Sequence, residues 1–142
     1  MNLRVTAPEA LHPARREVEI VERKGRGHPD TLCDTLAEEF SRQLCRCYLH
    51  EFGAVLHHNV DKVLLWGGTS RPAFGGGEML EPIEVFLAGR AVTSHQGVDL
   101  PVPALARDAA RSVMRRCVPG LDVDRDLRVH CLVRPSDPSL TE

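Results

Sequence analysis

The first long helix predicted in this chain starts directly after a short stretch rich in charge and glycine, Glu22-Arg-Lys-Gly-Arg-Gly-His-Pro-Asp30. Beyond it, apolar residues recur every three to four positions, which predicts a helix over 30–51 with one buried face. That face consists of Leu32, Leu36, Phe40, Leu44 and Cys47/Tyr48, with Cys33 and Cys47 acting as small apolar core residues. Pro29 suits the first helical turn and Gly53 suits the far end.

The residues that precede this stretch and overlap its start show a second pattern. Charged and apolar residues alternate from Glu17 to Arg23, which predicts a half-buried strand over 17–23. His28 and Asp30 then stand where a strand leads into a helix N-terminus, where free backbone N–H groups and the helix dipole favour anions. The pattern therefore points to phosphate chemistry.

The rest of the chain predicts an α+β layer. Strands are expected over 54–58, 61–66, 82–92 and 127–133, a glycine-rich loop over 69–77, and a second helix over 103–117. Together with the first strand and helix, this order predicts a mixed sheet with both helices on one face. Residues 1–16 read as a loose leader, 17–133 as one folded domain, and 134–142 as a polar tail.

Composition narrows the class of protein. A chain of 142 residues with a net charge of −2 can bury a real core and gives no bulk reason to expect nucleic-acid or membrane partners. Five cysteines without a CxxC pair indicate a reducing compartment, and the absence of a long apolar run or secretion signal adds to an expected cytoplasmic location. Lys24 and Lys62 are the only two lysines.

Two interpretations compete for the stretch at the start of the first helix. His28 and Asp30 are able simply to cap the helix. Alternatively, Gly25 and Gly27 allow a ligand to approach the backbone, while a histidine donor and a carboxylate that holds Mg²⁺ are what a departing polyphosphate requires. The groups that would serve such a site are Glu22, Lys24, Arg26, His28 and Asp30.

The segment His57-His58-Asn59-Val60-Asp61-Lys62 is the second cluster of polar groups. Zinc is disfavoured there, because neighbouring side chains on a strand point to opposite faces. Asn59 and Asp61 would share a face and are able to hydrogen-bond a small polar ligand. The structural alternative is a turn that enters a strand.

Two further features have a structural and a functional interpretation. Phe74-Gly-Gly-Gly-Glu78 matches neither nucleotide-binding glycine motif; it is a mobile loop with a carboxylate at its tip or, more simply, a hairpin turn. Arginines at 107, 111, 115 and 116 indicate a solvated helix face, with RNA binding as a minor option that lacks stacking aromatic residues.

Three segments in order resemble a known family. VERKGRGHPDTLCDTLAEEFSRQL, LHHNVDKVLLWGGTSRPAFGGGE and EPIEVFLAGRAVT are similar to the amino-terminal part of archaeal-type S-adenosylmethionine synthetase, also called methionine adenosyltransferase. The resemblance runs from about Glu17 to Val133. It implies a βαββαβ unit, one of three related domains in a protein that forms dimers with an active site shared between subunits.

The resemblance also implies a reaction, in which the sulfur of methionine attacks C5′ of ATP and the whole triphosphate leaves. His28 would then contact the leaving oxygen and Asp30 would bind Mg²⁺, with K⁺ as a further ion used by the family. Nucleotide or methionine would be bound by Glu22, Lys24, Asn59, Asp61, Lys62 and Glu78, with Glu22 on ATP and Glu78 facing the methionine ammonium.

Members of that family are far longer than this chain, and three explanations stay open. The chain is one part of a split or multi-chain synthetase, a regulatory homologue that binds nucleotide or a full-length synthetase, or a truncated piece. The presence of Glu22, His28, Asp30 and Asp61 favours the first. A homo-oligomer, or a hetero-oligomer with a chain that supplies the missing domains, is therefore expected.

Overall fold

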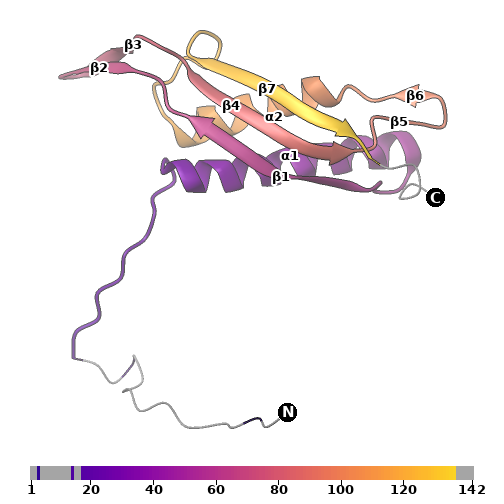
Figure 1. The fold of residues 1–142 in the computed structure, drawn as a ribbon. Helices are drawn as coiled ribbons and strands as arrows, with labels where there is room; N and C mark the ends of the chain where they lie inside the picture. The colour runs from indigo at the N-terminus through magenta and orange to yellow at the C-terminus, as the bar shows by residue number, and fades with distance from the viewer. Residues whose placement is uncertain (1–2, 4–13, 15–16, 137–142) are drawn as a thin grey trace.

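A computed structural model describes residues 3, 14 and 17–136 of the chain. The elements in order are α1 (Pro29–Phe52), β1 (His58–Trp66), β2 (Ser70–Ala73), β3 (Gly76–Met79), β4 (Ile83–Ala91), β5 (Ser94–His95), β6 (Val98–Asp99), α2 (Val102–Cys117) and β7 (Leu127–Pro135). Figure 1 shows the two helices running beside the long strands, with the β2–β3 and β5–β6 hairpins at opposite ends of the sheet.

The first helix begins and ends where the sequence predicts. His28 is the N-cap residue, Pro29 opens the first turn, and Gly53 closes the helix in the left-handed conformation with φ of 71°. The backbone N–H of Gly53 donates to the carbonyl of Leu49 at 3.1 Å. The predicted apolar stripe is buried, since Leu36, Phe40, Leu44 and Tyr48 have no exposed surface.

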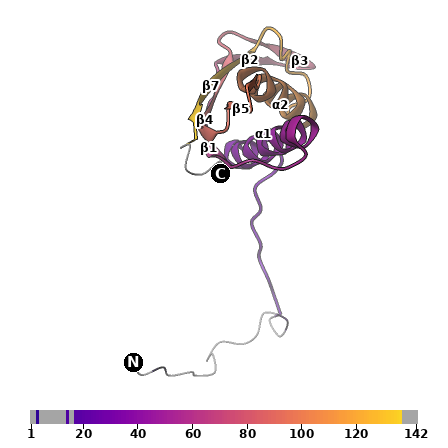
Figure 2. The same cartoon turned by 90° about the vertical axis from the view of Figure 1, so that its right-hand side faces the viewer.

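The central sheet has three strands in the order β1-β4-β7. β1 pairs antiparallel with β4, and β4 pairs parallel with β7, so the sheet is mixed. Figure 2 shows α1 and α2 together on one side of this sheet. The other face carries exposed apolar side chains, because Leu64, Trp66 and Leu132 keep 62%, 64% and 57% of their surface accessible.

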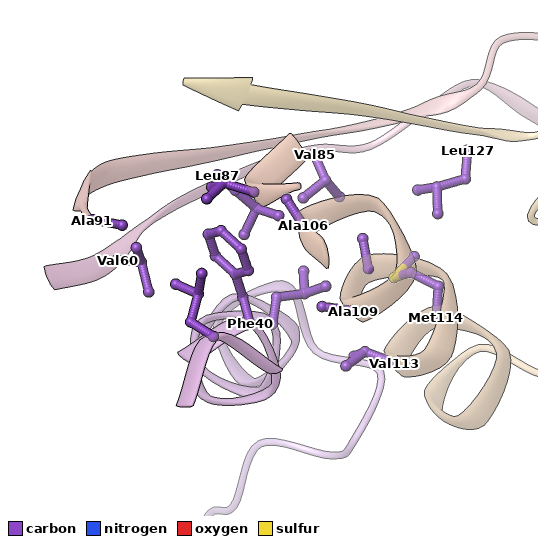
Figure 3. Packing of buried hydrophobic residues seen from close by; sticks show 14 of the residues in the cluster. Phe40, Val60, Val85, Leu87, Ala91, Ala106, Ala109, Val113, Met114 and Leu127 are labelled. Atoms are coloured by element: carbon purple, nitrogen blue, oxygen red, sulfur yellow. The ribbon is translucent and has the colours of Figure 1, made fainter. Parts of the chain in front are cut away.

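Small residues on α2 let the helices and the sheet pack closely. Ala106, Ala109 and Ala110 are fully buried, and Val113 and Met114 complete the same face. Figure 3 shows Phe40 of α1 pointing toward Leu87 of the sheet, and Val85 of the sheet near Ala106 of α2. The remaining buried apolar residues are Leu32, Leu36, Leu44, Tyr48, Val60, Ala91, Val92, Leu100, Val102, Val123 and Leu127.

A β-bulge interrupts the pairing of β1 with β4. Asn59 pairs with Arg90 and Lys62 pairs with Ala88, so two residues of β1, Val60 and Asp61, stand opposite Gly89 alone. The bulge changes the phase of the strand: Val60 is buried before it, whereas Val63 and Leu65 are the residues that pack toward the core after it. Gly89 has φ of 153°, and an added Cβ there would lie 2.1 Å from the carbonyl oxygen of Asn59.

The strand predicted over 17–23 is wrong. The described segment 17–28 contains no strand, and Val18, Ile20 and Val21 are 73%, 93% and 82% exposed. Both views show this segment leading away from the start of α1 (Figures 1 and 2). An alternating pattern forms a strand only where a neighbouring strand and an apolar surface accept it, and no described part of this chain offers them to 17–23.

Other boundaries also differ from the sequence prediction. No strand covers 54–57, because the chain enters the sheet only at His58, and the separate strands 54–58 and 61–66 are replaced by the single bulged β1. The segment predicted as a loop over 69–77 forms most of the β2–β3 hairpin, in which Gly75 takes φ of 79°. The segment after β4 forms the small β5–β6 hairpin, which the sequence prediction had omitted.

The predicted α+β class is confirmed, with both helices on one face of a mixed sheet. Because the first predicted strand is absent, the described residues form the αββαβ part of the expected unit, with two added hairpins. The leader over 1–16 lies almost entirely outside the described residues, as does the tail from 137 onward. β7 continues to Pro135, two residues into the predicted tail.

Gly89→Ala is expected to destabilise the fold by about 2–4 kcal/mol, because the new methyl group would meet backbone atoms of the bulge and the residue would keep an unfavourable φ. Urea unfolding followed by circular dichroism measures the loss. Gly67→Ala is the matched control, since its Cβ would meet nothing within 4 Å, and it is expected within about 0.5 kcal/mol of the native chain. Equal unfolding midpoints for the two variants would contradict this account of the bulge.

Candidate functional site

The predicted polar groups lie mainly along the contact between α1 and β1, where the surface forms two hollows. The helix-start hollow has a volume of about 360 Å³ and is lined by Pro29, Asp30, Cys33, Asp34 and Val63–Leu65. The mid-helix hollow has a volume of about 390 Å³ and is lined by Ala37, Glu38, Ser41 and His57–Asp61. α1 and β1 supply one wall each.

His28 caps α1 with its imidazole ring. Nδ1 accepts a hydrogen bond from the backbone N–H of Asp30 at 3.1 Å. A ring nitrogen that accepts carries no proton, so the neutral ring must hold its proton on Nε2. The cap therefore fixes the tautomer and leaves Nε2–H as a donor on a side chain that is 41% exposed.

Asp30 forms an ion pair with Lys24, which precedes the helix. The hydrogen bond and the charge of Lys24 lower the pKa of Asp30 below its ordinary value of 3.8. Both partners are more than half exposed, so the pair is open to exchange with a ligand. The structure thus brings Lys24, His28 and Asp30 together at one helix end.

Asn59 and Asp61 line the mid-helix hollow and flank the buried Val60. Asp61 pairs with Lys62, whose hydrogen bond lowers the pKa of the Asp61 carboxyl. Lys62 itself is exposed and does not line the hollow.

The two groups of polar residues are separated along the helix. α1 and β1 run antiparallel, so the start of α1 lies beside Val63–Leu65 and its middle lies beside the start of β1. Eight residues separate Asp30 from Glu38, which corresponds to about 12 Å along the helix axis. A single small ion cannot contact both groups, whereas an extended ligand that lies along α1 could.

Glu22 and Glu78 are not brought to these hollows. Glu22 is exposed in the segment that leads away from α1. Glu78 lies on β3 and forms an ion pair with Arg71 of β2 at 2.7 Å. Figure 2 shows the β2–β3 hairpin and α1 on opposite sides of α2.

Sequence reasoning missed three polar residues that line the hollows. Asp34 and Glu38 follow Asp30 at intervals of four residues, and Ser41 continues the same side of the helix. The signal was available, because residues four apart on a helix share a face, and this face adjoins the apolar stripe. With Asp30 and Asp61, these residues make the α1–β1 contact acidic.

A single carboxylate fits the way proteins usually hold Mg²⁺, which keeps several waters and binds one or two carboxylates together with substrate phosphates. Asp30 is such a group: it is charged, exposed and at a helix N-terminus. Within the described residues no three histidine, cysteine or acidic side chains gather as a metal cluster. No helix in the same part of the chain has the length and apolar character to cross a bilayer.

The predicted arginine face on α2 is largely solvated, as expected. Arg111 and Arg115 both contact Asp124, at 3.1 Å and 3.3 Å, and these pairs reduce the free positive charge of that surface.

Comparison with known proteins supports the resemblance found in the sequence. The family model described as S-adenosylmethionine synthetase (AdoMet synthetase) matches residues 1–142. A probable S-adenosylmethionine synthase of Aquifex aeolicus is 45% identical over 97% of this chain and 35% of its own length. The S-adenosylmethionine synthase of Methanococcoides burtonii is 47% identical over 87% of this chain and 31% of its own length.

The S-adenosylmethionine synthase of Methanocaldococcus jannaschii is 42% identical over 89% of this chain and 33% of its own length. The chain therefore spans about a third of the length of the curated relatives it matches. Because the family model covers every residue, this chain belongs to the S-adenosylmethionine synthetase family.

Proposed function

We propose that this chain contributes to S-adenosylmethionine synthesis from ATP and L-methionine as part of a split or multi-chain enzyme. In this reaction the methionine sulfur attacks C5′ of ATP, the bond from C5′ to oxygen breaks, and triphosphate leaves. The observation that carries the proposal is the His28 cap, which presents one N–H donor at a helix start in a chain of this family. The proposal extends to ATP and methionine as ligands.

His28 would stabilise the leaving oxygen. Its Nε2–H is a neutral donor whose orientation is held by the bond from Asp30 N–H to Nδ1. A fixed donor aimed at developing charge is the type of interaction that lowers a barrier most, because it needs no reorganisation during the reaction. The positive end of the α1 dipole adds attraction for the same anion.

Lys24 and Asp30 would handle the phosphate chain. Asp30 is the residue that would hold Mg²⁺, and the bound ion would supply positive charge that offsets the triphosphate. Lys24 is a flexible, exposed side chain that pairs with Asp30 in the free protein, so it can turn to a phosphate oxygen when Asp30 takes another partner.

Asn59, Asp61 and Lys62 would bind the nucleoside or methionine end of the substrates. The hollow that Asn59 and Asp61 line lies about three helix turns from His28, in keeping with a ligand that extends along α1. Glu22 and Glu78 lie away from both hollows, so they would serve a site completed by another chain or a second copy.

Exposed apolar side chains support the proposal that this chain packs against another polypeptide. Ile20 and Val21 precede α1, and Trp66 lies on the open sheet face. Burial of these exposed side chains against a partner would stabilise the assembly. The relatives are about three times as long, so a partner that supplies the remaining domains would provide both this cover and further basic residues.

A non-catalytic role is the second candidate. It is favoured by one observation: both lysines are paired with the carboxylates nearest the hollows, so neither lysine offers net positive charge to a polyphosphate. In that case the chain would be a regulatory subunit that binds nucleotide or docks on a complete synthetase.

The two candidates differ in turnover. The purified chain is incubated with ATP, methionine and Mg²⁺, alone and with a chain that supplies the remaining synthetase domains, and S-adenosylmethionine is measured by chromatography. The enzyme proposal expects product only in the mixture. Nucleotide binding by titration calorimetry without product in any mixture would favour the regulatory role, and the absence of both would refute the proposal.

Substitution of His28 separates its two roles. His28→Asn keeps a good helix cap, while His28→Ala removes the cap and should cost about 1 kcal/mol of stability. Neither variant places a donor at the position of Nε2, because alanine has no donor and the asparagine amide is shorter than the ring, so both are expected to lower turnover of the assembled enzyme by about 10²-fold. If His28→Asn retained full turnover, the proposed role of His28 at the leaving oxygen would be wrong.

Asp30→Asn is expected to raise the Mg²⁺ concentration for half-maximal activity by about tenfold, equivalent to ~1.4 kcal/mol, because the amide is a weaker ligand. Asp34→Asn, one helix turn away, removes the same charge and serves as the control. Because the pKa of Asp30 lies below its ordinary value of 3.8, the carboxylate stays ionised at pH 3.8 and above. We expect it to lose Mg²⁺ by protonation only at a lower pH. Equal effects of the two substitutions would contradict a specific role for Asp30.

A further inference from the structure

A cluster of three side chains, two of which line the mid-helix hollow, has no part in the proposed adenosyl transfer. His58 Nε2 lies 2.9 Å from Ser41 Oγ and 3.8 Å from Cys45 Sγ. Ser41 and Cys45 are one turn apart on α1, and all three side chains are half-buried. Two possible nucleophiles therefore share one possible base.

The tautomer of His58 makes Nε2 the base. His58 Nδ1 lies 2.9 Å from the carbonyl oxygen of Leu56, which can only accept, so Nδ1 must carry the proton. Nε2 of the neutral ring is then an acceptor facing the hydroxyl and the thiol. If Nε2 takes a proton, the bond to Leu56 remains and stabilises the imidazolium, as the orienting group does in a nucleophile–histidine pair.

We propose that Cys45 is a reactive thiol of this chain and that, with His58 as its base, it attacks small cationic disulfides. The thiol proton passes to His58 Nε2 and the sulfur attacks one sulfur of the disulfide. The disulfide S–S bond breaks, the leaving thiolate takes the proton from His58, and Cys45 ends as a mixed disulfide. The exchange is balanced, since one thiol and one disulfide are consumed and one of each is formed.

The thiol is favoured over the hydroxyl by chemistry. A thiol ionises within reach of imidazole, whereas a serine hydroxyl needs oxyanion donors in addition to a base. The attached group would have room in the adjoining hollow of about 390 Å³, which His58 lines.

The charged groups around Cys45 and His58 determine which reagents the thiol attracts. Glu38 and Asp61 line the same hollow, and Asp61 is already paired with Lys62, so Glu38 leaves the hollow acidic and favours a cationic reagent. His57 also lines the hollow, and its Nδ1 is 3.4 Å from Ser136 Oγ. Tyr48 packs beside His58, and burial raises the pKa of Tyr48 to about 12, so it stays neutral.

The chain contains its own control thiols. Cys33 and Cys47 lie on the same helix and are also half-buried, but burial raises the pKa of both. Nearby acidic side chains oppose their ionisation as well, Glu51 acting on Cys47 and Asp30 and Asp34 acting on Cys33. They report how fast a thiol of this helix reacts without a base.

The test treats the full chain with cystamine, quenches with acid at intervals, and measures modification of each cysteine by peptide mass spectrometry. At pH 7, Cys45 is expected to react at least about tenfold faster than Cys33 and Cys47. His58→Gln should lower the Cys45 rate to that of Cys47 without changing Cys47. Ser41→Ala should keep the advantage of Cys45 or increase it, because the competing hydroxyl is gone.

A comparison of pH values keeps the test decisive if His58→Gln fails to fold. In the native chain the advantage of Cys45 should shrink at pH 9, where the solvent ionises a larger share of every thiol than at pH 7. An advantage of equal size at both pH values would indicate accessibility alone and overturn the proposal. So would a Cys45 rate no faster than that of Cys47, or a fast rate in folded His58→Gln.

Discussion

The packing of the apolar stripe of α1 onto the sheet is the constraint on which the rest of this structure depends. Leu36, Phe40 and Leu44 are fully buried, so the rotation of the helix about its axis is fixed. Once that rotation is fixed, the residues beside the stripe must face the edge strand β1. The two hollows, the acidic line from Asp30 to Glu38 and the pairing of Cys45 with His58 all follow from this one packing arrangement.

Two histidines show how a backbone contact sets the chemistry of a side chain. His28 uses Nδ1 as an acceptor to cap α1, whereas His58 uses Nδ1 as a donor to the Leu56 carbonyl. Their neutral rings therefore offer opposite functions at Nε2, a donor in His28 and an acceptor in His58. Residue type alone leaves both options open, and local backbone geometry decides between them.

The sequence allowed much of the fold to be predicted but less of the site. The helix signals were local and reliable, because Pro29, Gly53 and the apolar spacing act within a few residues of each other. The strand over 17–23 failed because a strand requires a partner that no pattern within it can supply. The bulge at Val60 and Asp61 escaped detection because it depends on Gly89, about thirty residues away. For the same reason, the grouping of Lys24, His28 and Asp30 was predictable, while the distance of Glu78 from them was not.

Electrostatics limits what these residues can do alone. A polyphosphate that lies along α1 would meet the helix N-terminus and His28 at one end, but also the carboxylates of Asp30, Asp34 and Glu38. Lys24 and Lys62 are each engaged by a neighbouring aspartate, so they mainly balance charge already present. Attraction for such a ligand must then come from cations held by the carboxylates or from basic residues other than these two lysines. The acidic wall therefore opposes a polyphosphate unless its charge is offset, either by bound cations or by basic residues.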